Sequence, residues 1–235
     1  MHIDAALSPA EIDLLPQSDL SATVCIVFDV LRATSSILTA LAHGTREIRP
    51  ALTIEEALAV QAQSPDFILA GERFGDCIPG FDLGNSPQEY ARPGLERIVT
   101  TTTNGTVALR ACAAAQAVWV GALLNMQALE ERLRGSRPER VMLVCAGTFR
   151  EPALEDILAA GMLTEAFPQA DCSDAAQTAR AVYREHRADL PAALRRAKNG
   201  RALIQNGRAH DVEYCAAVSR LPVVGLLSDG IIRAD

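Results

Sequence analysis

Short apolar runs alternate along the chain with longer segments in which apolar and polar residues are mixed. The clearest example lies within residues 22–38, where the apolar run Val24–Phe28 leads directly into Asp29. A continuous apolar run of this length is typical of a strand that is buried on both faces. Arg32 follows in a short loop, and Thr34 opens a segment with the spacing of an amphipathic helix. The pattern predicts a core strand that ends in an acid, closely followed by a helix.

The same order of strand, loop and helix recurs after residues 101 and 145. Apolar runs predict strands at Met1–Ala6 (an edge strand), Arg46–Arg49, Phe67–Ala70, Arg97–Thr101, Val118–Val120, Val141–Cys145 and Val223–Leu227. Periodic segments predict helices at Thr34–His43, Thr53–Gln63, Val107–Ala114, Asn125–Leu133 and Leu154–Phe167. Residues 173–221 have helical character with interruptions at Pro191, Gly200 and Gly207, whereas Gly71–Pro87 is too rich in Gly and Pro to be regular.

Alternation of five or six short strands with helices of about ten to fifteen residues predicts an α/β fold. We expect three layers, α/β/α, around a mostly parallel or mixed sheet of about six strands. The helical segment near the C-terminus should pack on this sheet, as a cap or as further outer helices. No linker-like segment divides the chain, so we expect a single domain over residues 1–235, with a possible subdivision near 150–170.

Composition narrows the class of protein. Hydrophobic residues make up 49% of the chain and charged residues 22%, which is a globular balance. The net charge of −7 disfavours a nucleic-acid surface. No stretch approaches the roughly 18 apolar residues of a membrane helix, and the first residues do not resemble a signal peptide. We therefore expect a cytoplasmic protein with no nucleic-acid or membrane partner, and a homodimer as the default assembly.

Basic residues and cysteines limit the chemistry. Lys198 is the only lysine among 22 basic residues, so a cation that binds an anion should be an arginine, with its bidentate fork. The six cysteines contain no CxxC pair, which disfavours a zinc site or a disulfide framework. Walker A, GxGxxG, C-x5-R, DxD and GxSxG signatures are all absent.

Four loops carry polar residues where predicted strands meet the following helices, the place where ligands gather in α/β sheets. Their candidate residues are, in turn, Asp29, Arg32, Thr34 and Ser35; Glu72, Arg73, Asp82, Asn85 and Ser86; Thr102, Thr103, Asn104, Gly105 and Thr106; and Gly147, followed by Glu155 and Asp156. The third loop is the most suited to phosphate, because hydroxyls and backbone N–H groups surround a glycine that lets a ligand approach. It could equally be a polar turn that caps a helix.

The acids of these loops also allow more than one interpretation. Asp29 could be a helix-cap acceptor, a metal ligand or a nucleophile. Glu155 and Asp156 point about 100° apart on a helix, so we expect one to face the site. Acids in a first helical turn are also ordinary partners of the helix dipole. What the loops share is a combination of acids, arginines, threonines and asparagines.

These loops are also where the chain resembles the 2-phosphosulfolactate phosphatase family. The matching stretches are FDVLRATSSI (28–37), GER (71–73), PGFDLGNSP (79–87), TTTNGTVAL (101–109), CAGT (145–148), LEDILAAG (154–161) and, more weakly, GRAL and GRAHDVEYCA within 200–216. GFDLGNSP and TTNGT are specific in combination, and the others support them. The resemblance spans nearly the whole chain.

The resemblance implies a Mg²⁺-dependent phosphatase that hydrolyses (R)-2-phospho-3-sulfolactate to 3-sulfolactate and phosphate, a step towards coenzyme M in methanogens. With this family in view, the catalytic candidates are Asp29, Arg32 and Glu72, and the metal candidates are Asp29, Asp82, Glu155 and Asp156. Substrate or phosphate would contact Arg32, Thr34, Ser35, Arg73, Asn85, Ser86, Thr102, Thr103, Asn104, Gly105, Thr106 and Gly147. Arg32 and Arg73 would give forked contacts to the anionic groups.

Two alternatives to this activity remain open at the level of sequence. The first is a phosphatase of the same fold that acts on another small phosphorylated hydroxy acid. The second is a non-catalytic protein that binds an anionic metabolite; acids and arginines in four separate loops speak mildly against it. The role of Asp29 as metal ligand or nucleophile, and the choice among Glu72, Asp82, Glu155 and Asp156 as magnesium ligands, are likewise open.

Overall fold

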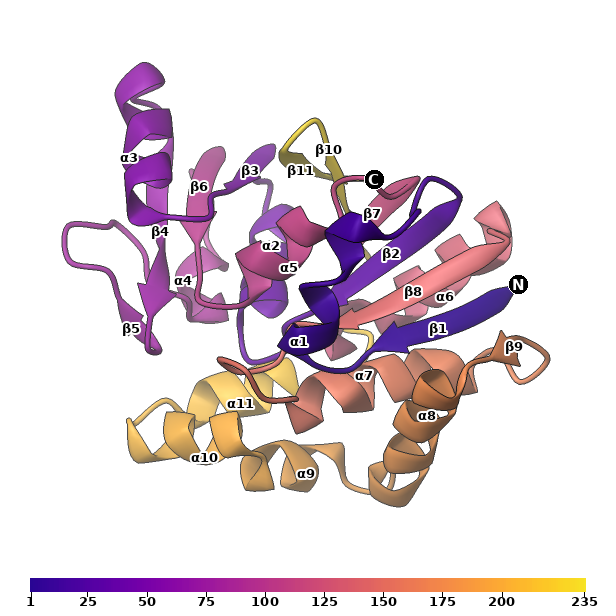
Figure 1. Cartoon of the computed structure of the whole chain (residues 1–235). Coiled ribbons are helices and arrows are strands. Elements are labelled where there is room, and N and C mark those ends of the chain that lie inside the picture. Colours follow the sequence, from indigo (N-terminus) through magenta and orange to yellow (C-terminus); the bar gives the residue numbers. More distant parts are fainter.

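The computed structural model describes all 235 residues and has an eleven-stranded sheet at its centre. The strands are β1 (His2–Ala6), β2 (Thr23–Phe28), β3 (Glu47–Pro50), β4 (Ile68–Arg73), β5 (Asp76–Cys77), β6 (Arg97–Thr101), β7 (Ala117–Gly121), β8 (Arg140–Cys145), β9 (Asp171–Cys172), β10 (Gly225–Ser228) and β11 (Ile231–Ala234). Across the sheet they follow the order β5-β4-β6-β3-β11-β10-β7-β2-β8-β1-β9. Figure 1 shows the long strands β2, β8 and β1 side by side.

Two blocks of parallel strands make up most of this sheet. β2 runs parallel to β7 and β8, and β1 runs parallel to β8. β6 runs parallel to β3 and β4. The antiparallel hairpin β10–β11 joins the blocks by pairing with β7 and with β3. The carboxyl ends of β2, β4, β6 and β8 nevertheless reach one pocket, through Asp29, Glu72, Thr103 and Gly147.

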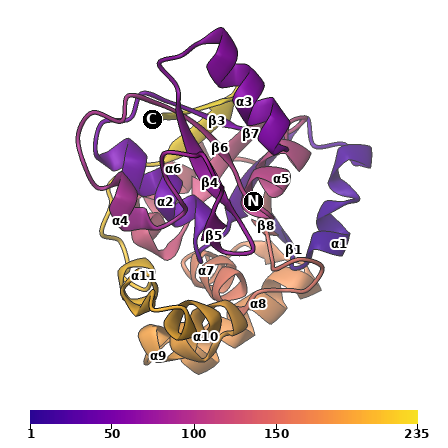
Figure 2. The same cartoon turned by 90° about the vertical axis from the view of Figure 1, so that its left-hand side faces the viewer.

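Eleven α-helices cover the two faces of the sheet. They are α1 (Pro9–Ile12), α2 (Ala33–Ala42), α3 (Ile54–Gln63), α4 (Pro87–Tyr90), α5 (Gly105–Ala111), α6 (Met126–Ser136), α7 (Leu154–Glu165), α8 (Asp174–His186), α9 (Leu190–Arg196), α10 (Lys198–Gln205) and α11 (Ala209–Cys215). Figure 1 shows α7 to α11 together below the sheet, and Figure 2 shows α9, α10 and α11 gathered at the same end of the molecule. None of the helices is long and apolar enough to cross a membrane.

The composition of β2 explains the layered packing. Val24, Ile26 and Phe28 pack into a core that includes side chains of α6 to α11. Cys25 and Val27 pack into a second core, on the face covered by α1, α2 and α5. Successive side chains of a strand point to opposite faces of the sheet. A strand with helices on both faces therefore needs a continuous apolar run, as the sequence indicated.

The predicted α/β class is confirmed, but the sheet has eleven strands rather than about six. The additional strands are short or polar. β5 and β9 have two residues each, and β11 is the four-residue second strand of a hairpin. Such segments form strands because they pair with the free edge of a neighbouring strand. They have no periodic hydrophobic pattern by which the sequence could reveal them. Because β9 pairs outside β1, the predicted edge strand Met1–Ala6 lies one position inside the edge.

Several predicted boundaries are also corrected. β4 continues to Arg73 and β5 follows it, so Gly71–Pro87 is regular at its start. The helix expected from Val107 begins at Gly105. In the C-terminal segment, Pro191 stands in the first turn of α9, where its missing N–H costs nothing, and Gly200 lies inside α10.

Candidate active site

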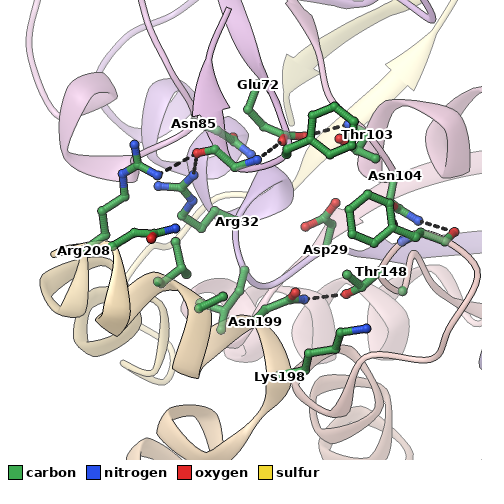
Figure 3. Close-up of a pocket in the computed structure, with 18 residues that line it drawn as sticks. Asp29, Arg32, Glu72, Asn85, Thr103, Asn104, Thr148, Lys198, Asn199 and Arg208 are labelled. Atoms are coloured by element: carbon green, nitrogen blue, oxygen red, sulfur yellow. Dashed lines mark hydrogen bonds between the residues drawn. The ribbon is translucent and has the colours of Figure 1, made fainter.

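A small pocket lies where the carboxyl ends of the strands face helix α10. Its 18 lining residues come from the loop after β2, the end of β4 and the turn that follows it, the loop before α4, the loops after β6 and β8, and the segment 198–208. Figure 3 shows Asp29 in the middle of this pocket, with Arg32 on one side and Asn104 on the other. Segments that are distant in sequence thus bring acids, cations and amides together.

Asp29 ends β2 with its side chain only 9% exposed. Its Oδ1 accepts a hydrogen bond from the backbone N–H of Ala33 at 3.1 Å. The Thr34 hydroxyl donates to the Asp29 carbonyl oxygen at 2.9 Å and accepts from the Asp29 N–H at 3.0 Å, which fixes the backbone. Burial, reinforced by the negative charges of Glu72 and Glu155, raises the pKa of Asp29 to about 7.

Gly105 allows α5 to approach this carboxylate closely. A Cβ atom at Gly105 would lie 2.6 Å from Asp29 Oδ2 and 2.6 Å from the Cβ of Ala33. Both distances are far below van der Waals contact, so only glycine fits unless the carboxylate moves. The glycine in the TTNGT motif is therefore required by packing against Asp29.

Glu72, at the end of β4, joins two loops of the pocket. Its Oε2 accepts from the backbone N–H of Gly75 at 2.7 Å, and its Oε1 accepts from that of Thr103 at 2.7 Å. The carboxylate is only 7% exposed, although it lines the pocket. Both oxygens thus fix the positions of neighbouring loops as well as placing negative charge beside Asp29.

Arg32 is held by a buried ion pair with Asp211 of α11. Its Nη1 donates to Asp211 Oδ2 at 2.6 Å, and its Nη2 donates to the carbonyl oxygen of Gly75 at 2.9 Å. The Ser86 hydroxyl donates to the other oxygen of Asp211 at 2.5 Å. The guanidinium is 4% exposed and still lines the pocket.

The two acids of α7 make different contacts, and neither of them lines the pocket, although one was expected to face it. Asp156 accepts from the backbone N–H groups of Val30 at 2.8 Å and Gly147 at 2.9 Å, so it anchors the loops after β2 and β8. Glu155 accepts from Asn199 at 2.6 Å through Oε1. Its Oε2 is buried and has no hydrogen-bond partner. Burial, the leading cause, raises the pKa of both acids.

Asn104 fastens the loop after β8 at the opposite side of the pocket. Its Nδ2 donates to the carbonyl oxygen of Ala146 at 3.0 Å, and its Oδ1 accepts from the Phe149 N–H at 3.0 Å. The ring of Phe149 lies 6.0 Å from that of Phe74, centroid to centroid, and both side chains line the pocket and are exposed. These two rings give the pocket an apolar rim.

The structure brings seven of the predicted site residues to the pocket surface: Asp29, Arg32, Glu72, Asn85, Thr103, Asn104 and Gly147. The others lie behind it or elsewhere: Thr34, Ser35, Arg73, Asp82, Ser86, Thr102, Gly105, Thr106, Glu155 and Asp156. Several of these have clear structural contacts. Arg73 donates to Thr101 Oγ1 at 2.9 Å, Asp82 accepts from the Leu69 N–H at 2.9 Å, and the Ser35 hydroxyl donates to the Val30 carbonyl oxygen at 2.8 Å. Thr102 and Thr106 bond to each other.

Segment 198–208 contributes pocket residues that the sequence did not single out. These are Lys198, Asn199, Ala202, Leu203, Asn206 and Arg208. Asn199 donates both to Thr148 Oγ1 and to Glu155 at 2.6 Å, and Lys198 pairs with Glu151 at 2.6 Å. The segment has the composition of an ordinary helix, so only its weak resemblance to the family pointed to it. The segment is far from the other loops in the sequence, so its position beside the pocket could not be predicted.

Oxygen ligands for a divalent cation are present, although no group of three or more His, Cys, Asp or Glu side chains is arranged around a common point. Asp29 faces the pocket, and the buried Oε2 of Glu155 and Oγ1 of Thr103 have no partner. Mg²⁺ commonly takes one or two carboxylates and keeps several waters. The Asp29 carboxylate and these unsatisfied oxygens therefore fit a hydrated Mg²⁺.

An α/β fold with acids, arginines and amides at the carboxyl ends of its strands defines an enzyme class that handles small anionic molecules. The family profile described as 2-phosphosulpholactate phosphatase matches residues 10–230. A probable 2-phosphosulfolactate phosphatase of Deinococcus radiodurans is 40% identical, with 93% of each chain covered. The protein of the same name from Symbiobacterium thermophilum is 37% identical, over 93% of this chain and 97% of its own. The chain belongs to the 2-phosphosulfolactate phosphatase family, a family of phosphoric monoester hydrolases.

Proposed function

We propose that this protein hydrolyses (R)-2-phospho-3-sulfolactate to 3-sulfolactate and phosphate, with Mg²⁺ as cofactor. The observation that carries the proposal is the buried Asp29 carboxylate, which faces a pocket that also presents the guanidinium groups of Arg32 and Arg208. Family membership supports the choice of substrate. In an organism that makes coenzyme M, the reaction would supply 3-sulfolactate to that pathway.

The charges of the pocket suit a substrate with phosphate, carboxylate and sulfonate groups. The chain carries a net charge of −7, so such a ligand needs local positive charge. Arg32, Lys198 and Arg208 line the pocket and supply it. Thr103 and Asn85 add a hydroxyl and an amide group that can hydrogen-bond to phosphoryl oxygens.

Asp29 is the residue that acts closest to phosphorus in this proposal. Its Oδ1 accepts a hydrogen bond from the Ala33 N–H, while Oδ2 makes no hydrogen bond within the protein. In one route Oδ2 attacks phosphorus, the ester P–O bond breaks, and water then hydrolyses the aspartyl-phosphate. In the other route Asp29 helps to hold the cation, and water attacks phosphorus directly. In both, the leaving oxygen of the substrate takes up a proton and becomes the hydroxyl of sulfolactate.

Asp29 and Glu155 are the residues that we propose to hold Mg²⁺. Thr103 would hydrogen-bond to a water of its hydration shell. When bound, the cation neutralises charge that develops on the phosphoryl group. Asp82 is not part of this set, because its carboxylate is bonded to the Leu69 N–H away from the pocket. Asp156 holds two loop N–H groups and would position Gly147.

A panel of phosphorylated acids tests the substrate. We expect 2-phospho-3-sulfolactate to give the highest kcat/KM, ahead of 2-phospholactate, 2-phosphoglycolate and phosphoserine. A clear preference for one of the other acids would reassign the substrate within the same reaction class. Tight binding of these acids without phosphate release would instead indicate a binding protein, contrary to the proposal.

Single-turnover hydrolysis in ¹⁸O-labelled water separates the two routes. In the covalent route, water attacks either the phosphorus or the acyl carbon of a carboxylate that has already taken the phosphoryl group. With unlabelled enzyme and attack on the carbon, the first phosphate released contains no ¹⁸O, and the label enters Asp29. After several turnovers, ¹⁸O in both Asp29 and phosphate identifies the covalent route with attack on the acyl carbon. Label in phosphate alone, with no phosphoenzyme on rapid acid quench, identifies direct attack by water.

A further inference from the structure

Two arginines from distant parts of the chain converge on one carbonyl oxygen. Arg32 Nη2 and Arg208 Nη1 donate to the Gly75 oxygen at 2.9 Å and 2.8 Å. Figure 3 shows the two guanidinium groups meeting at the end of the pocket away from Asn104. A neutral carbonyl oxygen does not balance the charge of two guanidinium groups, whereas an anionic ligand would accept hydrogen bonds from both and offset their charge. The pair is thus arranged for an anionic ligand.

The two arginines differ in how their charges are balanced. Arg32 is paired with Asp211, whose side chain is fully buried. Arg208 is paired with Asp76 at 2.9 Å, but the Asp76 side chain is 73% exposed and that of Arg208 is 29% exposed. Ion pairs of this exposed kind contribute little to stability. The charge of Arg208 therefore remains available to a ligand, while Arg32 is the fixed partner beside it.

The acids of the pocket lie between these arginines and Asn104. Asp29 and Glu72 are both there, and their negative charges disfavour the approach of a phosphoryl group unless a cation offsets them. The arginine end needs no metal to receive an anion. A substrate with two separated acid groups would satisfy both ends at once.

We infer that Arg208, together with Arg32, binds the sulfonate, one of the two acid groups of the substrate that are not transferred, and that Arg208 sets the preference for phosphate esters that carry a sulfonate. This inference rests on the proposed function. A sulfonate has three acceptor oxygens and can accept from both guanidinium groups, in place of the Gly75 carbonyl oxygen. The phosphoryl group then lies at the Asp29 end. Arg73, the second arginine expected from the sequence, is turned to Thr101 and does not line the pocket.

Three secondary alkyl phosphates of decreasing charge test this assignment: 2-phospho-3-sulfolactate, 2-phospholactate and isopropyl phosphate. For Arg208→Gln, kcat/KM should fall about 10- to 100-fold with the sulfonate, mostly through KM, because charged hydrogen bonds are lost. The fall should be less than about twofold with isopropyl phosphate, which has no second acid group. The kcat/KM of Arg208→Lys with the sulfonate should lie between those of the wild type and Arg208→Gln, since lysine keeps the positive charge but not the bidentate guanidinium group.

Arg201→Gln is the matched control, because Arg201 is an exposed arginine of the neighbouring helix α10 and does not line the pocket. It should leave all three rates unchanged. A similar loss with all three esters in Arg208→Gln would overturn the inference. Thermal unfolding of each variant identifies any loss that comes from misfolding.

Calorimetric titration with 3-sulfolactate tests the same claim without catalysis. Wild-type protein should bind it, and Arg208→Gln should bind it at least tenfold more weakly. Equal affinities, or no binding to the wild type, would contradict the inference. If sulfolactate binds through Arg208 but 2-phospho-3-sulfolactate is not hydrolysed, the proposed reaction is wrong and the anion site stands.

Discussion

The carboxylate of Asp211 holds the guanidinium of Arg32 at 2.6 Å, and the two side chains are 0% and 4% exposed. They are 179 positions apart in the sequence. The pair connects the loop after β2 with helix α11, so the C-terminal helices complete the site as well as covering the sheet. Ser86 adds a third loop to this contact. Arg32 is thus pre-oriented before any ligand binds.

The first prediction concerns this buried pair. Asp211→Asn should lower the free energy of unfolding by about 3–5 kcal/mol, because it leaves the Arg32 charge buried without its counter-charge. Urea denaturation measures the change. Glu213→Gln is the control on the same helix, since Glu213 forms an exposed pair with Arg195 worth at most about 1 kcal/mol. Equal effects of the two substitutions would show that Asp211 is not a buried charge partner.

The second prediction is a pH dependence in the metal-free protein. The pKa of Asp29 rises from 3.8 to about 7 on folding, so between these values the folded state binds more protons than the unfolded state. The free energy of unfolding must therefore fall as pH rises through this window. The raised pKa values of Glu155 and Asp156 act in the same direction.

Asp29→Asn isolates the contribution of Asp29 to that slope. The loss of stability between pH 4 and pH 7 should be smaller in the variant by a few kcal/mol, because one extra bound proton changes the free energy of unfolding by about 1.4 kcal/mol per pH unit. Unfolding in urea at four pH values, with chelator present, gives the two curves. Parallel curves would mean that Asp29 keeps an ordinary pKa.

The third prediction tests the close approach of α5. Gly105→Ala should reduce kcat/KM by at least about 100-fold, because its methyl group would displace the Asp29 carboxylate. Gly135→Ala provides a helical control with no neighbouring atom within 4 Å. It should leave activity unchanged and slightly increase stability. Full activity in Gly105→Ala would show that Asp29 can move without loss.

The fourth prediction concerns the metal. Exhaustive chelation should abolish phosphate release, and Mg²⁺ should restore it. Mg²⁺ should also raise the Tm of the chelated wild type but not that of Asp29→Asn, since ligand binding to the folded state adds to stability. Unchanged activity after chelation would remove Mg²⁺ from the proposal. An equal rise in Tm in both proteins would place the ion away from Asp29.

The sequence predicted the parts of the fold that local pattern determines. The continuous apolar run Val24–Phe28 predicts a strand that is buried on both faces, as observed. The helix expected from Thr53 is present as α3, and the Thr53 side chain caps it by accepting from the Glu56 N–H. Two-residue strands such as Asp76–Cys77 could not be found, because their pairing depends on a neighbouring strand and not on their own residues.

Only the part of the candidate site that lies at the ends of the strands could be predicted from the sequence. Asp29, Glu72 and Asn104 follow strands, where the general rule for α/β sheets places ligand groups. Arg73 and Asp82 occur in the same motifs, but whether a side chain points into the pocket depends on its register in the strand. Arg208 lies directly before α11 and Asp211 lies within it, and the placement of this segment is a tertiary effect, so no local pattern could assign them.

The most direct test of the whole account is phosphate release from (R)-2-phospho-3-sulfolactate by the wild type and by Asp29→Asn, in the same Mg²⁺ buffer. We expect the wild type to produce phosphate and 3-sulfolactate in equal amounts. Asp29→Asn should be slower by at least about 1,000-fold, the scale seen when a group that stabilises the transition state is removed. A wild type that releases no phosphate, or a variant that turns over at a near-normal rate, would contradict the central claim.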